Sequence, residues 1–213
     1  MSSVKTMFLT VEGVEGVGKS TNIETIRDFL SSQNIDYILT REPGGTVVAE
    51  QIRELLLAVN ENDPLCELSE LLLVFAARAQ HLEKVIKPAL TQGKWVICDR
   101  FTDATYAYQG GGRGLNRSTI SELESLVQGE LRPDLTIILD LDPRIGLRRV
   151  SARGELDRFE LEKLEFFDKV RQTYLDIAAA DPQRYVVIDA ARDLETVKSN
   201  LVEVLTTVLM TNA

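Results

Sequence analysis

The sequence EGVEGVGKST (residues 12–21) decides the fold of this chain, and it directly follows the short apolar run MFLTV (residues 7–11). It contains the pattern Gly-x-x-x-x-Gly-Lys-Ser, and apolar residues recur at helical spacing after it. A glycine-rich loop between a strand and a helix lets successive backbone N–H groups turn around an anion, and the start of the helix adds partial positive charge. The segment therefore predicts a P-loop that binds the phosphates of a nucleoside triphosphate.

Three side chains of this loop matter for its chemistry. Lys19 is expected to reach the β- and γ-phosphates, and Ser20 to ligate Mg²⁺. Glu15 is unexpected, because a carboxylate among phosphates is repulsive unless it faces away or meets a donor. A turn that only caps a helix is the alternative, but the strand before the loop and the helix after it argue against that interpretation. The residues expected around the nucleotide are Gly13, Val14, Glu15, Gly16, Val17, Gly18, Lys19, Ser20 and Thr21.

Apolar runs typical of strands alternate with helical patterns along the rest of the chain. The runs cover residues 7–11, 37–40, 95–98, 135–141 and 185–188. Apolar stripes at helical spacing lie at residues 23–30, 68–86 and 194–208. This alternation predicts one three-layer α/β domain over residues 1–213, in which helices cover both faces of a mostly parallel, five-stranded sheet. Ligands bind such sheets beyond the carboxyl ends of the strands.

The composition narrows the classes of protein to consider. The content of 44% hydrophobic and 27% charged residues is that of a globular protein. The longest unbroken apolar run, residues 71–77, is far shorter than the roughly 20 residues of a membrane span. Without a signal-peptide pattern, and with Cys66 and Cys98 as reduced thiols, we expect a cytoplasmic protein that is not bound to a membrane. The net charge of −9 argues against nucleic acid as a partner.

Five arginines are concentrated in residues 144–158 of the sequence. The residues are Arg144, Arg148, Arg149, Arg153 and Arg158. The planar guanidinium group can grip a phosphate through two parallel hydrogen bonds, which lysine cannot do. The segment therefore predicts a phosphate-binding element, with a solvated helix face as the alternative.

The dipeptide Asp99-Arg100 ends the third predicted strand. Asp99 is expected to orient Mg²⁺ and Arg100 to hold a second phosphate, with a surface ion pair as the alternative.

Asp140 ends the fourth strand and is interpreted as structural. His81, the only histidine, is interpreted as a partly exposed helix residue without a catalytic role. The chain lacks an Asn-Lys-x-Asp guanine-reading motif, which argues against a GTPase.

Four more motifs follow the P-loop: REPGGT (residues 41–46), DRF (99–101), AYQGGGRG (107–114) and RPDLT (132–136). Together with the P-loop they closely resemble bacterial thymidylate kinases over residues 7–191. The resemblance implies transfer of the γ-phosphoryl group of ATP to dTMP, giving dTDP and ADP. It also implies the P-loop nucleoside-monophosphate-kinase fold with a mobile lid, and a homodimer.

The resemblance also implies roles at matching positions on the acceptor side. Arg53 and Arg100 would hold the 5′-phosphate of dTMP, and Tyr108 would crowd C2′ and so disfavour ribonucleotides. Arg78 would donate to a thymine carbonyl. The other residues implied there are Arg41 and Pro43 in the acceptor loop, Phe75 stacked on thymine, and Thr105 and Gln109 at the base edge.

Catalytic roles follow from the same resemblance. Glu15 would bind the 3′-hydroxyl of dTMP or an arginine that clamps its phosphate. The P-loop carries no arginine, so the positive charge for the transition state would come from a lid over about residues 148–162. In that lid Arg153 would face the transition state, and Arg149 and Arg158 would assist at the ATP side. The residues expected to take part in catalysis are Lys19, Glu15, Asp99, Arg100 and Arg153.

Several alternatives stay open from the sequence. Phe75 belongs to the apolar stripe of its helix, so packing in the core is an alternative to stacking on a base. The same stripe suits either a dimer interface or a core. A deoxynucleoside kinase is a rival function, although it would not need an arginine pair for an existing phosphate. A P-loop regulator without acceptor chemistry is another, and it would need none of the acceptor-side residues.

Overall fold

The computed structural model describes residues 5–152 and 156–211. Its strands are β1 (Phe8–Glu12), β2 (Tyr37–Arg41), β3 (Trp95–Asp99), β4 (Leu135–Asp140) and β5 (Tyr185–Asp189). They form one sheet in the order β2-β3-β1-β4-β5, and every neighbouring pair is parallel. The predicted five-stranded parallel sheet is confirmed, and each strand lies where an apolar run predicts it.

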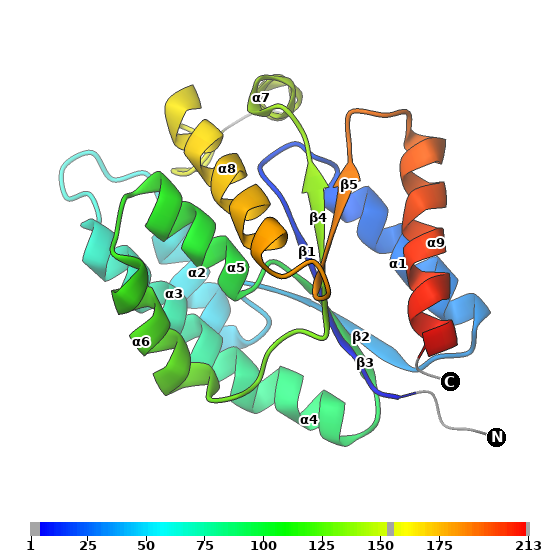
Figure 1. The fold of residues 1–213 in the computed structure, drawn as a ribbon. Coiled ribbons are helices and arrows are strands. Elements are labelled where there is room, and N and C mark those ends of the chain that lie inside the picture. The colour runs from blue at the N-terminus through cyan, green and yellow to red at the C-terminus, as the bar shows by residue number, and fades with distance from the viewer. Residues whose placement is uncertain (1–4, 153–155, 212–213) are drawn as a thin grey trace.

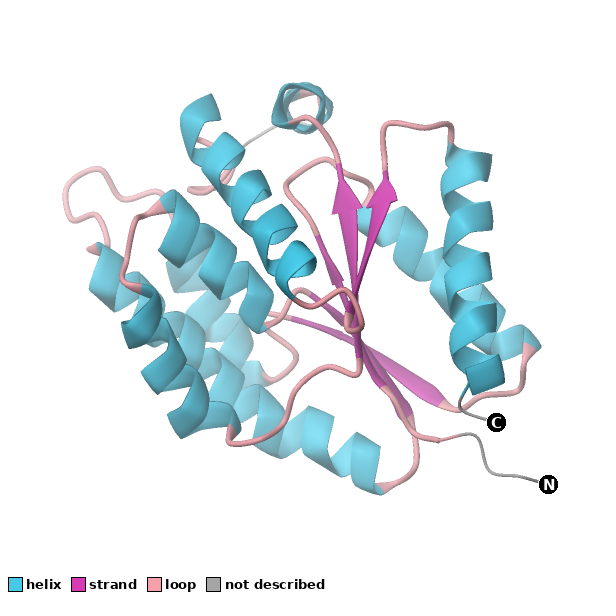
Figure 2. Cartoon of the chain, viewed as in Figure 1, coloured by secondary structure: helices cyan, strands magenta, loops and turns pink. Residues whose placement is uncertain are grey.

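Helices cover both faces of the sheet, which gives the predicted three layers (Figures 1 and 2). Helices α1 and α9 pack on each other on one face, and the other helices lie mainly on the opposite side (Figure 1). The α-helices are α1 (Lys19–Ser32), α2 (Val47–Leu57), α3 (Glu67–His81), α4 (Lys87–Thr91), α5 (Thr102–Thr105), α6 (Arg117–Gln128), α7 (Pro143–Ser151), α8 (Leu164–Ala180) and α9 (Leu194–Thr211). Two π-helical segments, η1 (Leu82–Ile86) and η2 (Tyr106–Gly112), continue α3 and α5. No helix within the described ranges has the length and apolar character needed to span a bilayer.

Alternation along the strands separates two hydrophobic clusters. Leu9 of β1 packs in the larger cluster, which includes Ile26 of α1 and Leu201 of α9. The preceding residue, Phe8, packs in a second cluster with Leu82 of η1. Because successive strand side chains point to opposite faces, one short apolar run supplies both cores.

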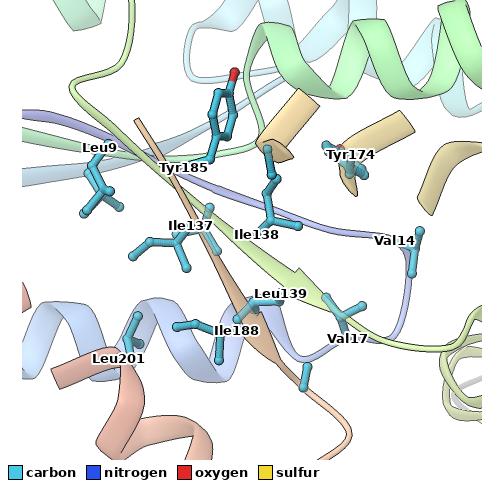
Figure 3. Close-up of a cluster of buried hydrophobic side chains, with 14 of the residues drawn as sticks. Leu9, Val14, Val17, Ile137, Ile138, Leu139, Tyr174, Tyr185, Ile188 and Leu201 are labelled. Carbon is cyan, nitrogen blue, oxygen red and sulfur yellow. The ribbon is translucent and has the colours of Figure 1, made fainter. Parts of the chain in front are cut away.

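The P-loop is fixed to the larger cluster by its own apolar residues. Val14 and Val17 are each 3% exposed and lie in this cluster, as the close-up shows (Figure 3). Burial of a valine side chain stabilises a fold by roughly 1.5–3 kcal/mol. The apolar positions of the loop therefore hold it in place, while its glycines shape the surface that faces a ligand.

The ends of the strands bring the functional segments together. In the sheet register, Asp99 of β3 lies beside Val11 of β1 and Arg41 of β2. The P-loop also touches α7, because a Cβ on Gly16 would lie only 2.2 Å from the backbone oxygen of Gly146. Gly16 has a φ of +73°, so glycine serves both the turn and this close contact.

Candidate active site

A cavity of about 510 Å³ lies where these segments meet. Its wall combines the P-loop with residues of α2, α3, α5, η2 and α7 and with the segments that follow β2 and β3. The predicted site residues that line it are Glu15, Gly16, Val17, Gly18, Lys19, Ser20, Thr21, Pro43, Arg53, Arg78, Asp99, Arg100, Thr105, Tyr108, Gln109 and Arg149. The structure thus brings the predicted nucleotide side and the predicted acceptor side into one hollow.

A few predicted residues lie elsewhere. Arg41 is exposed, and its Nη2 pairs with Oε2 of Glu50 at 2.8 Å. Phe75 is 2% exposed in a core cluster, and its ring centroid lies 4.8 Å from Cζ of Arg78. The core-packing alternative for Phe75 therefore describes this arrangement, and its stacking on a base stays a prediction. Arg153 lies outside the described residues.

Lys19 lies inside the curve of the P-loop. Its Nζ donates to the backbone oxygens of Gly13 and Val14, at 3.1 and 3.2 Å. Burial, together with the nearby positive charge of Arg100, lowers the pKa of Lys19 to about 8. A bound phosphate would supply the negative charge that favours the ammonium form.

Ser20 and Asp99 fit the chemistry expected of a magnesium site. Ser20 lies in the first turn of α1, and both side chains line the cavity. Oδ1 of Asp99 is buried and has no hydrogen-bond partner among the described residues. The described ranges hold no group of three His, Cys, Asp or Glu residues that could hold a metal ion. Proteins commonly bind Mg²⁺ through one or two side chains together with substrate phosphates and water, and the role of Ser20 and Asp99 in such a site stays a prediction.

Two arginines form a positive region beside the P-loop. Nη1 of Arg53 donates to the backbone oxygen of Pro43 at 3.1 Å. Burial, together with the positive charges of Arg41 and Arg100, lowers the pKa of Arg53. Arg100 has a φ of +67°, an uncommon value for a residue other than glycine. Like charges that face one partly buried hollow favour the binding of an anion there.

The contacts of Glu15 explain how the P-loop accommodates an acid. Its Oε1 accepts from Nη2 of Arg100 at 2.8 Å, and its Oε2 accepts from the hydroxyl of Tyr108 at 2.6 Å. Cζ of Arg100 also lies 4.8 Å from the ring centroid of Tyr108. Both carboxylate oxygens therefore meet donors, and one of these donors belongs to Arg100, the arginine that is predicted to hold a phosphate.

Two residues near Arg100 were not identified from the sequence. They are Tyr174, which contacts Arg100, and Glu12, which contacts Tyr174. The fully buried carboxylate of Glu12 accepts from the backbone N–H of Phe101 and from the hydroxyl of Tyr174, both at 2.7 Å. That hydroxyl also accepts from Nη1 of Arg100 at 3.4 Å. Burial, with the charge of Asp103 adding to it, raises the pKa of Glu12 to about 8. An acid at the end of a buried strand was a usable signal for Glu12, but nothing local pointed to Tyr174.

Arg78 of α3 lines the same cavity as Lys19, and it is 1% exposed. Its Nε donates to Oε2 of Glu42 at 2.7 Å. Its Nη2 donates to the hydroxyl of Thr105 at 2.9 Å and to the backbone oxygen of Phe101 at 3.2 Å. Nη1 is buried without a partner among the described residues.

The interpretation of His81 as a partly exposed residue is wrong. The imidazole is 0% exposed, with Nδ1 3.0 Å from Oε1 of Glu42 and Nε2 2.6 Å from the hydroxyl of Thr40. Helical spacing placed His81 beside Arg78 but gave no sign that strand β2 and the loop after it would cover both residues. Glu42, which the sequence analysis did not select, links the two side chains.

Arg158, which was expected to assist at the ATP side, instead contacts residues of α2 and α3. Its Nη1 pairs with Oε2 of Glu70 at 2.7 Å, and its Nε donates to the backbone oxygen of Leu56 at 2.8 Å. Glu70 also accepts from Nε2 of Gln109 at 2.7 Å. The end of the predicted lid is therefore attached to α2 and α3, on the acceptor side. Arg149, in contrast, lines the cavity and donates from Nη1 to the backbone oxygen of Gly16 at 3.1 Å.

Asp140 has the structural role that the sequence analysis assigned to it. Its two oxygens accept from Nε and Nη2 of Arg171 on α8, at 2.7 and 2.8 Å. This paired geometry joins the end of β4 to α8. Asp140 does not line the cavity, which leaves Asp99 as the strand-end acid that faces the P-loop.

Comparisons with known proteins agree with this geometry. The sequence profile of the family described as Thymidylate kinase matches residues 11–201. A Thymidylate kinase from Pseudomonas savastanoi pv. phaseolicola is 60% identical over 195 residues, which cover 92% of each chain. One from Teredinibacter turnerae is 58% identical over 194 residues, covering 91% of this chain and 94% of that one. The crystal structure of thymidylate kinase from Ehrlichia chaffeensis superposes with a TM-score of 0.76 at 39% identity, covering 95% of this chain and 99% of that one.

Proposed function

The chain belongs to the thymidylate kinase family, and we propose that it transfers the γ-phosphoryl group of ATP to dTMP, giving dTDP and ADP. The observation that carries this proposal is the presence of Arg53 and Arg100 in the same cavity as the P-loop. A donor that carries phosphates and an acceptor that already carries one need separate groups of positive charge, and this cavity supplies both.

On the donor side, the backbone N–H groups of residues 13–19 would bind the phosphates of ATP. Lys19 would neutralise charge between the β- and γ-phosphates, and Arg149 would lie beside them from α7. Ser20 and Asp99 would hold Mg²⁺, which when bound stabilises negative charge on the transferring phosphoryl group. Val14 and Val17 would keep the loop rigid from below, so the donor groups need little rearrangement.

On the acceptor side, Arg53 and Arg100 would grip the 5′-phosphate, with Glu15 and Tyr108 fixing the Arg100 side chain. Pro43 would close the pocket beside them. Phosphoryl transfer depends mainly on position and charge, so no general base is assigned. At the base end, Arg78, Thr105 and Gln109 would face the thymine edge, and Phe75 would support the base or the Arg78 guanidinium.

A lid over about residues 148–162 would complete the site. We assign the charge for the transition state to Arg153, because Arg158 is committed to Glu70 and Leu56. Close contact between Gly16 and Gly146 places helix α7 against the P-loop, so a lid that begins in the last turn of α7 would start next to the nucleotide phosphates.

The activity is tested by a coupled assay with ATP, Mg²⁺ and a panel of acceptors. The panel contains dTMP, dCMP, dGMP, dAMP and thymidine. The proposal expects dTMP to be the preferred acceptor and thymidine to be inert, because thymidine has no phosphate for Arg53 and Arg100. Preference for thymidine would favour a deoxynucleoside kinase. ATP binding without transfer to any acceptor would favour a P-loop regulator.

We further propose that the enzyme is a homodimer that works in the cytoplasm. Large apolar side chains stay exposed on α2, α3 and α6, and α3 packs against both of the other helices. These side chains are Val47, Val48, Leu55, Leu68, Leu72 and Leu126. Light scattering should give the mass of a dimer for the wild type and of a monomer for Leu72→Glu. A monomeric wild type would refute the dimer without affecting the proposed chemistry.

A further inference from the structure

A buried chain of polar side chains runs from β2 to the base end of the cavity. The hydroxyl of Thr40 contacts the imidazole of His81, the imidazole contacts Glu42, and Glu42 accepts from Arg78. The three ionisable members are 0%, 4% and 1% exposed. Water is therefore excluded from the contacts among these three side chains, whereas Thr40 is half-buried. Each of the three depends on its neighbours to fill its hydrogen-bonding capacity.

The donors of Arg78 can be counted one by one. A guanidinium group has five N–H donors, one on Nε and two on each terminal nitrogen. Glu42 takes the donor on Nε, and Thr105 and Phe101 take the two on Nη2. Only the two donors on Nη1 lack partners among the described residues. A carbonyl oxygen of a bound base would accept a hydrogen bond from Nη1, whereas an amino group in the same place would be repelled.

His81 fixes the carboxylate that fixes Arg78. A carboxylate only accepts, so the proton shared with Glu42 belongs to Nδ1, and Nε2 then meets the hydroxyl of Thr40. Contact of Oε1 with His81 fixes the plane of the carboxylate, and Oε2 then faces Nε of Arg78. Without His81, Glu42 could rotate about its last bond and offer either oxygen at a different angle.

The loop after β2 is shaped around this imidazole. Gly45 has a φ of +83°, and a Cβ at that position would lie 2.6 Å from Cδ2 and Nε2 of His81 and 2.7 Å from the hydroxyl of Thr40. Only glycine allows both the backbone turn and this close packing. The second glycine of REPGGT therefore packs directly against the histidine.

We propose that Glu42 and His81 are positioning residues that set Arg78 to distinguish an oxygen from an amino group at position 4 of the pyrimidine. This inference rests on the proposed role of Arg78 in binding the base, and it adds what determines the direction of its free donors. Arg78 is the residue that would touch the substrate. Glu42 and His81 act through it.

Kinetic discrimination between dTMP and dCMP tests the proposal. Glu42→Gln keeps the shape of the side chain but gives up the charge that both donors need. It should reduce the ratio of kcat/KM for dTMP over dCMP by about 5- to 150-fold, the cost of losing a hydrogen bond to a buried charged group. The effect should lie mainly in KM for dTMP, with KM for ATP unchanged.

Two variants of His81 separate its contacts. The amide of Asn lies near the place of Nδ1, so His81→Asn keeps a donor for Glu42 and loses Thr40. The longer Gln reaches toward the place of Nε2, so His81→Gln keeps a group for Thr40 and loses Glu42. The proposal expects His81→Gln to lower the dTMP/dCMP ratio by about 2- to 12-fold, the usual effect of one hydrogen bond, and His81→Asn to retain most of it.

Tyr185→Phe is a matched control for loss of a buried polar contact. Tyr185 donates to Asp103 at 2.7 Å, and in the described part of the chain no hydrogen bond joins either residue to Arg78 or Glu42. This variant should lower the melting temperature while leaving the dTMP/dCMP ratio unchanged. Equal effects of His81→Asn and His81→Gln on the ratio, or a lower ratio in Tyr185→Phe, would overturn the positioning role.

Arg78→Ala distinguishes this proposal from the one on which it rests. If Arg78→Ala lowers the ratio but Glu42→Gln does not, Arg78 reads the base and the positioning proposal fails. If Arg78→Ala leaves the ratio unchanged, the role of Arg78 itself fails.

Because the chain has one histidine, NMR provides a readout for tag-free protein that does not depend on turnover. Addition of dTMP should shift the imidazole nitrogen resonances, whereas ADP alone should not, and the opposite pattern would contradict the proposal.

Discussion

The two ends of the cavity differ in how far their side chains are already paired. At the base end, Arg78 is almost fully buried, and three of its five donors have partners. At the phosphoryl end, Lys19 has only the backbone oxygens of its own loop, and Oδ1 of Asp99 has no partner among the described residues. We therefore propose that the end that selects the acceptor is built in advance, whereas the end that transfers the phosphoryl group is completed by what binds there.

This difference has a physical reason. Recognition of a neutral base depends on a few directed hydrogen bonds, which are most selective when they are fixed before the ligand arrives. Phosphoryl transfer depends on charge that is strongest in the transition state, so its groups must stay available to the nucleotide. Changes at the phosphoryl end should therefore affect turnover, and changes at the base end should affect selection of the acceptor.

Lys19→Ala should have the largest effect. Loss of a cation that stabilises the transferring phosphoryl group should reduce kcat by about 10³- to 10⁵-fold, as for comparable charged groups in P-loop enzymes. Circular dichroism should show an unchanged fold, because the hydrogen bonds of Lys19 in the described part of the chain go to the loop oxygens of Gly13 and Val14. Near-normal turnover would show that the P-loop does not bind the transferring phosphates.

Arg153→Ala should come next. An arginine brought to the transition state from outside the P-loop should be worth about 10³-fold in kcat, at the lower end of the known range. The Kd for dTMP, measured by calorimetry, should stay within a few-fold of wild type. Arg149→Ala is the comparison, and it should raise KM for ATP more than it lowers kcat. A large loss of dTMP affinity in Arg153→Ala would move that residue to the acceptor side.

Glu12→Gln tests the buried acid that contacts Phe101 and Tyr174. Its pKa is raised to about 8 in the fold, so its stabilising effect is complete below about pH 4.5 and is lost as the pH rises toward 8. The free energy of unfolding of the wild type should therefore fall relative to Glu12→Gln by up to about 1.4 kcal/mol per pH unit across that window. Urea denaturation at pH 5, 6 and 7 measures this difference. Parallel curves for the two proteins would mean that Glu12 titrates normally.

Tyr174→Phe should have a smaller effect, confined to the acceptor. Removal of the hydroxyl takes one support from Arg100 and one from Glu12, so KM for dTMP should rise by about 2- to 12-fold while KM for ATP stays the same. Tyr185→Phe again removes a buried hydroxyl without contact to Arg100. An equal rise of both KM values in Tyr174→Phe would indicate a general structural effect.

Local patterns predicted the sheet and the P-loop because the evidence for each lies within a few neighbouring residues. A strand, a glycine-rich loop and a helix determine the positions of Lys19 and Ser20 almost without the rest of the chain. The burial of His81 and the contact between Tyr174 and Glu12, 162 residues apart, depend on how distant segments pack. The place of Arg158 likewise depends on helices α2 and α3. No spacing rule within one helix could have supplied these contacts.

Binding of dTMP and dCMP to the enzyme without ATP shows whether the base end is built in advance. Titration calorimetry without ATP or Mg²⁺ would give both dissociation constants, and steady-state kinetics would give the ratio of kcat/KM for the same two acceptors. If the base end is built in advance, the nucleotide-free enzyme should already prefer dTMP, by a factor within about threefold of the kinetic ratio, or 0.7 kcal/mol. If the preference for dTMP appears only when an ATP analogue is present, the nucleotide assembles the base end, and that end is not built in advance.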